Sequence, residues 1–389
     1  MKNITKKVLI IFIGLAFVSS CGSIMQSSQN TIQNTDETLV FIHGIKGGVL
    51  ADKRTGDTAW ITVPQALGVS TPNLKLPLQW SDADIPQQAK DNLIAVSPVD
   101  RLTLIPNIID IKIYNGILTE GAKKYKNFYP FGYDWRRSNL DSLDDYLKFL
   151  RKIVAKHHKP VKVIAHSMGG LLTMAAMQAD PELFDTVFFV GTPFAGGVGF
   201  LDDLHQGVST GTNSKILSPE VVASMPSTYS LFPLEAKAEL SDGKNPIKVD
   251  FFNPKDWEDL KIGPFAYDFA YNDQFRNHFT KALKVAKIFR QKLFNGKLVK
   301  NGERIAKQPK VYVIRGTSLT TLVQVVKNGP QSKLGWDFKS AAKEGGDGLV
   351  SAKDAYPPKG IDYTIFESKF QHGDQLNEPA VLKWIFEQI

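Results

Sequence analysis

The chain has a single cysteine, Cys21, among its 389 residues, so no disulfide can form within it. Long hydrophobic runs are scarce as well. The apolar stretch 8–18 has only eleven residues, about half of what a membrane-spanning helix needs. A disulfide-stapled scaffold is therefore excluded, and the fold must be held together by its hydrophobic core, for which a chain of this length is ample.

Three lysines precede the stretch 8–18, and Ser19, Ser20 and Cys21 follow it. A positive segment, a short apolar core and small residues in this order are typical of a secretory signal peptide. Small residues directly before a cysteine also resemble a bacterial lipobox. We therefore expect residues 1–20 to be removed and Cys21 to be diacylated.

A lipidated Cys21 would hold the mature protein on a membrane surface of the bacterial cell envelope, by default the outer membrane if the host is a diderm. Residues 21–37 are polar and are expected to be a flexible tether before a folded domain over 38–389. Removal of three lysines lowers the formal net charge from +8 to +5. An ordinary secretory signal with an incidental cysteine is the alternative, and palmitate labelling of wild type and Cys21→Ala distinguishes the two.

From residue 38 onward, short apolar runs alternate with segments of helical spacing. The runs expected to be buried strands are 39–42, 161–165, 187–190, 311–314 and 363–366. Helical spacing appears over 143–155 and 170–178. Short continuous apolar runs separated by helices are typical of βαβ units. The sequence therefore predicts an α/β fold with a mostly parallel central sheet flanked by helices.

The segment 165–169, Ala-His-Ser-Met-Gly, lies between a predicted strand and a predicted helix. This is the setting of a nucleophile elbow, with alanine in place of the usual first glycine. The turn strains the serine backbone and requires small residues two positions away on each side, which Ala165 and Gly169 supply. Ser167 is therefore the predicted nucleophile, and an α/β-hydrolase fold is expected around it.

Two backbone amides are expected to stabilise negative charge on the substrate. The first is that of Met168, at the positive end of the helix that follows the nucleophile. The second is that of Ile45, in the loop after the first predicted strand. The side chains of His43 and His166 are interpreted as scaffold, because histidines that flank an elbow serine are more often packed than catalytic.

A serine nucleophile needs a base and an orienting carboxylate, which this fold supplies in the chain order serine, acid, histidine. Of seven histidines, four precede Ser167 and two lie in other segments, which leaves His372, after the last strand run. Asp347 lies between glycines after the 311–314 strand and is the predicted acid. Asp354 and Asp374 remain rivals for that role.

Between residues 194 and 273 the regular alternation of short apolar runs and helical segments stops, and glycine, serine, proline and aspartate alternate with apolar clusters. A loop this long within a compact domain is usually functional, so we expect a lid or cap over the site. The apolar residues expected to line an acyl groove are Leu231, Phe232, Phe251 and Phe252.

Together these residues resemble the lecithin:cholesterol acyltransferase and lysosomal phospholipase A2 family. The matching motifs are His-Gly-Ile-Lys-Gly at 43–47, Tyr-Asp-Trp-Arg at 133–136, His-Ser-Met-Gly-Gly at 166–170, Gly-Thr-Pro-Phe-Ala-Gly-Gly at 191–197 and Gly-Asp-Gly-Leu-Val at 346–350. The resemblance implies acyl transfer from a membrane phospholipid through Ser167, Asp347 and His372 to water or an alcohol. It also implies an oxyanion hole made by Ile45 and Met168. We interpret the Tyr-Asp-Trp-Arg motif as a packed tryptophan with an Arg–Asp contact.

The sequence departs from that family in ways that keep alternatives open. His43 stands where the family usually has proline, and the chain cannot make the disulfides of the animal members. The segment 372–377 also resembles the histidine loop of secreted bacterial triacylglycerol lipases, in which an aspartate helps to bind calcium. A triacylglycerol lipase or carboxylesterase is therefore the second candidate function. No metal or other cofactor is predicted, and structural calcium near Asp374 is the alternative.

A catalytically silent binding module is the third candidate, although none of the predicted catalytic residues is missing. Lysines and arginines are concentrated over 281–310, a stretch expected to be helical with Glu303 as its sole acid. Such a stretch is compatible with polyanions. For an exported lipoprotein an anionic lipid surface is the favoured partner, and no nucleic acid is expected.

Overall fold

The structure, a computed structural model, describes residues 36–105 and 109–389. The predicted signal peptide, the lipidation site Cys21 and nearly all of the tether lie outside these residues, so they stay predictions. Within the described residues, no helix combines the length and the apolar character needed to cross a membrane.

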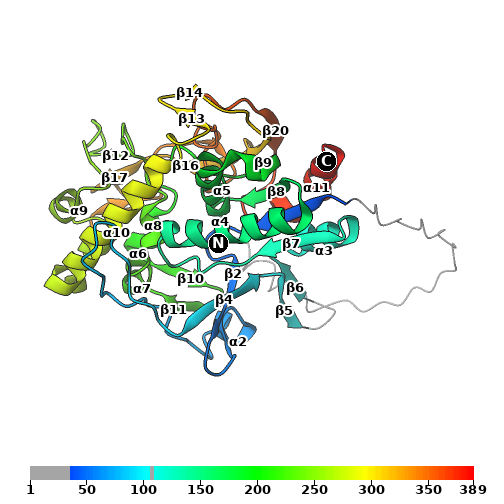
Figure 1. Ribbon diagram of the computed structural model, residues 1–389. Helices are drawn as coiled ribbons and strands as arrows, with labels where there is room; N and C mark the ends of the chain where they lie inside the picture. The colour runs from blue at the N-terminus through cyan, green and yellow to red at the C-terminus, as the bar shows by residue number, and fades with distance from the viewer. Residues whose placement is uncertain (1–35, 106–108) are drawn as a thin grey trace, which may run out of the picture. The chain divides into compact units, whose positions relative to one another are not determined.

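The centre of the fold is a six-stranded sheet in which every neighbouring pair is parallel, with the order β20-β15-β9-β8-β1-β7 (Figure 1). Its strands are β1 (Thr38–Ile42), β7 (Asn127–Phe131), β8 (Val161–His166), β9 (Phe184–Val190), β15 (Lys310–Gly316) and β20 (Thr364–Ser368). All five predicted strands are present. β7 was not predicted, because it is an edge strand with a proline and only one buried residue.

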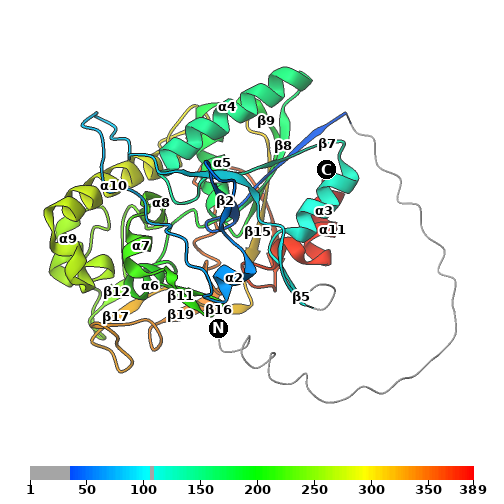
Figure 2. The same cartoon turned by 90° about the horizontal axis from the view of Figure 1, so that it is seen from below.

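Side chains alternate between two hydrophobic cores along each central strand, as the pleat requires. In β1, Val40 and Ile42 enter the larger core, whereas Leu39 and Phe41 enter the smaller one. The larger core also contains α4 (Asn139–His157), α5 (Met168–Ala179) and α10 (Asp273–Lys292). The smaller core contains α3 (Asn115–Lys124) and α11 (Pro379–Glu387), which lie together in Figure 2. The predicted α/β-hydrolase fold is confirmed, with helices on both faces of the sheet.

The remaining elements lie outside the central six-stranded sheet. Before β7 come β2 (Gly48–Asp52), β3 (Thr58–Trp60), α2 (Val63–Ala66), β4 (Leu93–Pro98), β5 (Arg101–Ile105) and β6 (Ile109–Lys112). Between β9 and α10 come α6 (Leu201–Gln206), β10 (Val208–Thr210), β11 (Asn213–Leu217), α7 (Pro219–Ala223), α8 (Pro226–Tyr229), β12 (Leu240–Ser241) and α9 (Pro254–Leu260). After α10 come β13 (Val299–Lys300), β14 (Glu303–Arg304), β16 (Leu319–Leu322), β17 (Val325–Lys327), β18 (Trp336–Asp337) and β19 (Lys343–Gly346).

The basic stretch 281–310 is not one helix, which corrects the sequence-based expectation. The helix α10 ends at Lys292, and the chain then forms the antiparallel pair β13–β14. Two Asn-Gly pairs explain the change, one directly after the helix and one at the hairpin turn, where Asn301 and Gly302 both have positive φ. Asparagine and glycine are the residues that tolerate this backbone conformation best.

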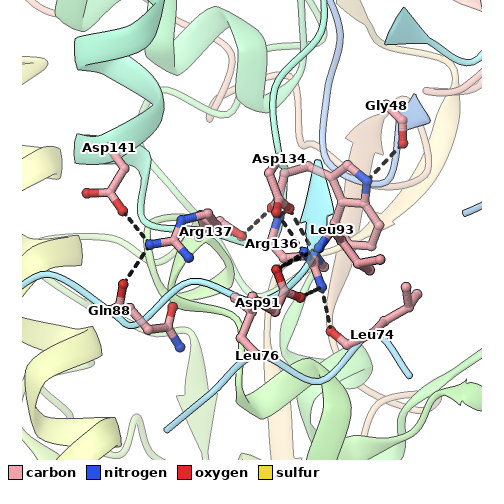
Figure 3. A network of polar contacts seen from close by, with 12 residues as sticks. Gly48, Leu74, Leu76, Gln88, Asp91, Leu93, Asp134, Arg136, Arg137 and Asp141 are labelled. Atoms are coloured by element: carbon pink, nitrogen blue, oxygen red, sulfur yellow. Dashed lines mark hydrogen bonds and ion pairs between the residues drawn. The ribbon is translucent and has the colours of Figure 1, made fainter. Parts of the chain in front are cut away.

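The Tyr-Asp-Trp-Arg motif follows β7 and acts as a structural clamp (Figure 3). The fully buried guanidinium of Arg136 donates to both Asp134 oxygens at 2.9 and 2.7 Å and to both Asp91 oxygens at 2.7 and 3.2 Å. It also donates to the carbonyl of Leu74, while Trp135 Nε1 donates to the carbonyl of Gly48 at 3.0 Å. The predicted packed tryptophan and Arg–Asp contact are confirmed, and these contacts fix the segments before β7 against the sheet.

Candidate active site

Ser167 occupies the sharp turn between β8 and α5. Its backbone has φ 53° and ψ −123°, a conformation that residues other than glycine rarely adopt. The amide of Ser167 donates to the carbonyl of Val190 at 2.9 Å, which holds the turn against β9. A Cβ added at Gly169 would collide with the carbonyl of His43, and one at Gly44 would lie 2.7 Å from the Ser167 Cβ. The requirement for small residues around the serine therefore has a direct steric cause.

Asp347 and His372 meet at the same carboxyl edge of the sheet. The Nδ1 of His372 lies 2.8 Å from Oδ2 of Asp347, and the His372 amide donates to the Asp347 carbonyl at 2.9 Å. A Cβ added at Gly191, in the turn after β9, would lie 3.0 Å from the imidazole and 3.1 Å from Asp347 Oδ2. Ser167 and His372 line one cavity. The structure thus brings the three predicted residues to one place, while their catalytic roles remain predictions.

The carboxylate of Asp347 is buried but well supplied with donors. Its Oδ1 accepts the amides of Leu349 and Val350 at 3.0 and 2.7 Å, and its Oδ2 also accepts Gln375 Nε2 at 3.1 Å. Burial raises the pKa of Asp347, but the His372 imidazole and these amides outweigh that effect and lower it below its ordinary value. Asp347 is therefore ionised at neutral pH and fixed in orientation.

The rival acids occupy different positions. Asp354 accepts the Ser351 hydroxyl at 2.9 Å and lies on the wall of a small cavity beside Ser167, where burial raises its pKa to about 6. Asp374 begins a short 3-10 helix over Gln375–Asn377, and its carbonyl accepts the Asn377 amide at 2.8 Å. Of the three candidates, Asp347 is the one whose carboxylate contacts the His372 ring.

The loop after β1 forms a tight turn in which the Gly47 amide donates to the Gly44 carbonyl at 3.1 Å. Ile45 and Lys46 are the central residues of this turn, and Lys46 has φ 63°. Ile45 lines the cavities next to Ser167. Met168 is the first residue of α5, so its amide is one of those with no carbonyl partner inside the helix. Both positions are compatible with the predicted oxyanion hole.

Two cavities meet at Ser167. The larger one, of about 420 Å³, also contains Ile45 and His372, and its apolar wall includes Trp60 and Val99. A much smaller one, of about 30 Å³, is lined by Leu231, Pro193 and Asp354 among others. The ion pair between Lys46 and Asp203, at 2.9 Å, joins the turn after β1 to α6 within the segment 194–273.

The aromatic residues expected in an acyl groove are mostly core residues in this structure. Leu231 does line the small cavity beside Ser167. Phe232 stacks on Phe251 with ring centroids 4.8 Å apart, and both pack edge-on against the fully buried Trp257. Phe252 is buried in the same core. Aromatic rings this tightly packed stabilise the segment, so in this conformation these three side chains belong to the core. That they line an acyl groove when the segment opens stays a prediction.

Within the described residues, no group of three or more histidine, cysteine, aspartate or glutamate side chains is arranged to hold a metal ion. Asp374 accordingly has no such cluster around it in this part of the chain, and the calcium hypothesis gains no support from acidic neighbours.

Buried histidines give the protein a specific acid sensitivity. Burial lowers the pKa of His43 to about 4, of His166 to about 3 and of His278 to about 4. In the unfolded chain each titrates near 6.5. Between these values the unfolded chain binds protons that the folded protein does not, so stability is complete above pH 6.5 and is lost as the pH falls towards 4. Each such histidine contributes about 1.4 kcal/mol per pH unit.

We expect His278→Gln to remove one of these titrating groups without changing the candidate site. Between pH 7 and pH 5, the variant should lose about 2 kcal/mol less unfolding free energy than the wild type does. Urea unfolding of both proteins at the two pH values measures this difference. The raised pKa of Asp354 acts in the opposite direction, but it is present in both proteins and cancels. Equal losses in the two proteins would contradict the prediction.

Sequence reasoning missed several residues that contact this site. Gln375 donates to Asp347, and the Tyr114 hydroxyl contacts both the Gly44 amide and the His166 ring. Gln375 lies three residues after His372, but no pattern marks its side chain as a ligand of the acid. Tyr114 is far from every motif in sequence and reaches the site only through the fold.

Comparison with known proteins points to one family. A sequence profile of the lecithin:cholesterol acyltransferase family matches residues 109–304, which is half of the chain and includes Ser167 but neither Asp347 nor His372. An uncharacterized protein of Saccharomyces cerevisiae is 27% identical over 239 residues, or 58% of this chain and 34% of that protein. The phospholipase A(1) LCAT3 of Arabidopsis thaliana is 34% identical over 92 residues, or 21% of this chain and 20% of that enzyme. The match therefore spans about a third of the length of the first relative and a fifth of that of the second.

Among solved structures, a chain of the Tle4–Tli4 complex superimposes with a TM-score of 0.54 and 15% identity, covering 90% of this chain and 97% of that one. At this identity the likeness concerns the fold alone. The profile match over half of the sequence is the stronger finding. The chain belongs to the lecithin:cholesterol acyltransferase family of α/β-hydrolases.

Proposed function

We propose that this protein is a serine acyl hydrolase or acyltransferase that cleaves fatty-acyl esters of membrane phospholipids. The observation that carries the proposal is that Ser167, on its strained turn, and His372, in contact with Asp347, line one cavity with apolar walls. Family membership supports it, since lipid acyl transfer is the reaction named for the family and phospholipase A(1) is the name of an Arabidopsis relative.

The proposed reaction begins when Ser167 Oγ attacks the ester carbonyl and His372 Nε2 takes its proton. Because Asp347 contacts Nδ1, the proton on that nitrogen is held and the charge of the imidazolium is compensated. The amides of Ile45 and Met168 stabilise the oxyanion. When the carbon–oxygen bond to the alcohol breaks, His372 returns the proton to the leaving alkoxide. Water or an alcohol then cleaves the acyl-enzyme by the same route in reverse.

The substrate class follows from the character of the cavity and from a lipid anchor that stays a prediction. Apolar walls such as those of Trp60, Val99 and Ile113 suit acyl methylenes, each of which gains about 0.8 kcal/mol on leaving water. An anchor at Cys21 would keep the cavity next to a bilayer. A carboxylesterase or lipase on uncharged esters is the second candidate, because the same residues and walls would serve it.

Assays on phosphatidylcholine vesicles and on a soluble short-chain ester separate these candidates. We expect release of long-chain fatty acid from vesicles, read by mass spectrometry, at a rate well above that on monomeric substrate. Ser167→Ala, assayed in parallel, controls for contaminating lipases. Rapid cleavage of the short ester with no detectable attack on vesicles would defeat the phospholipid proposal and favour the carboxylesterase.

A further inference from the structure

Tyr114 and His166 line the larger cavity at Ser167 and connect loops that are far apart in sequence. The Gly44 amide donates to the Tyr114 hydroxyl at 3.0 Å, and the same hydroxyl lies 2.8 Å from His166 Nδ1. The other ring nitrogen of His166, Nε2, lies 3.0 Å from the carbonyl of His372. Tyr114 is 4% exposed and His166 is 5% exposed, so most of each side chain is shielded from water.

The donor and the acceptor in each hydrogen bond of this series, from Gly44 through Tyr114 and His166 to His372, can be assigned by elimination. An amide can only donate, so the Tyr114 oxygen accepts from Gly44 and has its own proton left to give. That proton goes to Nδ1 of His166, which must then be unprotonated. The remaining proton of a neutral His166 is on Nε2 and is donated to the His372 carbonyl. The lowered pKa of His166, caused first by burial, agrees with a neutral ring.

Each end of this hydrogen-bond series reaches a predicted part of the catalytic site. Gly44 begins the tight turn that carries Ile45, and a Cβ on Gly47 would lie 2.8 Å from the Tyr114 ring, so the ring also packs under the turn. At the other end, the residue whose carbonyl is held is His372 itself. The His166 ring also lies against the His372 ring, with centroids 4.7 Å apart.

We propose that Tyr114 and His166 are positioning residues, which hold the Ile45 amide and the His372 imidazole in register with Ser167. This inference rests on the function proposed above, because it assigns a role within that reaction. Both side chains also line the larger cavity, so a change in kcat without a change in KM is what separates positioning from substrate binding. Both act by fixing the distance between the loop after β1 and the His372 loop, and displacement of a reacting group by about 1 Å can cost about a hundredfold in rate.

Tyr114→Phe tests the proposal with the smallest change, since it keeps the ring under the turn and removes the hydroxyl. On a soluble p-nitrophenyl ester we expect kcat to fall about 10- to 100-fold, less than or comparable to the loss of an oxyanion donor, which costs about 10²- to 10³-fold. KM should change less than about twofold, because the Tyr114 hydroxyl is engaged with Gly44 and His166 and phenylalanine keeps the ring at the cavity wall. Titration of active sites with a fluorophosphonate corrects kcat for any unfolded fraction.

Tyr125→Phe is the matched control, because Tyr125 is 4% exposed and lies in the same hydrophobic core as Tyr114. It should retain the wild-type kcat even if its Tm falls as much as that of Tyr114→Phe. A Tyr114→Phe protein with kcat within about twofold of wild type would overturn the proposal. So would a Tyr125→Phe protein with an equal loss of kcat, since the effect would then reflect general packing.

A double-mutant cycle adds a second criterion. His166→Leu removes the hydrogen bonds to Tyr114 and to the His372 carbonyl. Adding Tyr114→Phe to the His166→Leu variant should therefore lower kcat by less than about twofold further. Fully additive losses would show that the two residues act separately and would contradict the proposed hydrogen-bond series. If the wild type itself is neither labelled nor active on any ester, the proposed function fails first, and that result is distinct from an active wild type with an unimpaired Tyr114→Phe variant.

Discussion

Replacement of Ser167 by alanine should lower kcat by about 10⁴-fold or more while leaving the fold intact. The substitution removes one oxygen and keeps the Cβ, so the close packing of Gly44 against this residue is unchanged. Without the hydroxyl no acyl-enzyme can form, and what remains is the residual effect of binding and of the oxyanion donors. Hydrolysis of a soluble p-nitrophenyl ester gives kcat, and loss of fluorophosphonate labelling shows directly that the reactive oxygen is gone.

The matched control is Ser142→Ala, on α4, which removes a buried serine hydroxyl at a distance from the site. We expect it to retain wild-type activity and labelling. If Ser167→Ala kept activity within about tenfold of wild type, the hydrolase reaction would have to use another nucleophile, and the elbow would be a structural turn only.

Replacement of Asp347 by asparagine should cost up to about 10⁴-fold in kcat, because it removes the charge that orients His372 and compensates the imidazolium. The hydrogen bonds around this side chain make the effect severe. In the native protein Oδ1 accepts two backbone amides, and Oδ2 accepts from His372 and Gln375. An asparagine has one oxygen for four donors, so its amide nitrogen must face either the backbone donors or the imidazole.

Asp374→Asn and Asp354→Asn are the comparisons that give this prediction its force. Both exchange the same atoms, and neither side chain contacts the His372 ring, so we expect losses below about tenfold. Measurement of kcat and KM for all three variants on one soluble ester is sufficient. A crippled Asp374→Asn variant beside a mild Asp347→Asn variant would show that the histidine is oriented by a different acid.

Sequence alone determined the features that arise from local chemistry. Continuous apolar runs identified β1, β8, β9 and β15, because inner strands of a parallel sheet are buried on both faces. The edge strand β20 was identified by its run at 363–366, although Ser368 is its one buried residue. Small residues around Ser167 identified the turn, because nothing larger fits beside the His43 carbonyl. Chain order and the position after the last strand run selected His372, and the glycines around Asp347 favoured that residue over its rivals.

The tertiary structure decided the features in which distant segments meet. The edge strand β7 lacks a buried pattern and forms because β1 offers it hydrogen bonds on one side. Phe232 and Phe251 are suited by composition to an acyl groove, and only their packing against Trp257 makes them core residues. Tyr114 has no motif around it, and it reaches Gly44 and His166 because α3 packs against one face of the sheet. Periodicity and turn chemistry act over a few residues, whereas the supports of this site join loops that are close only after the sheet has assembled.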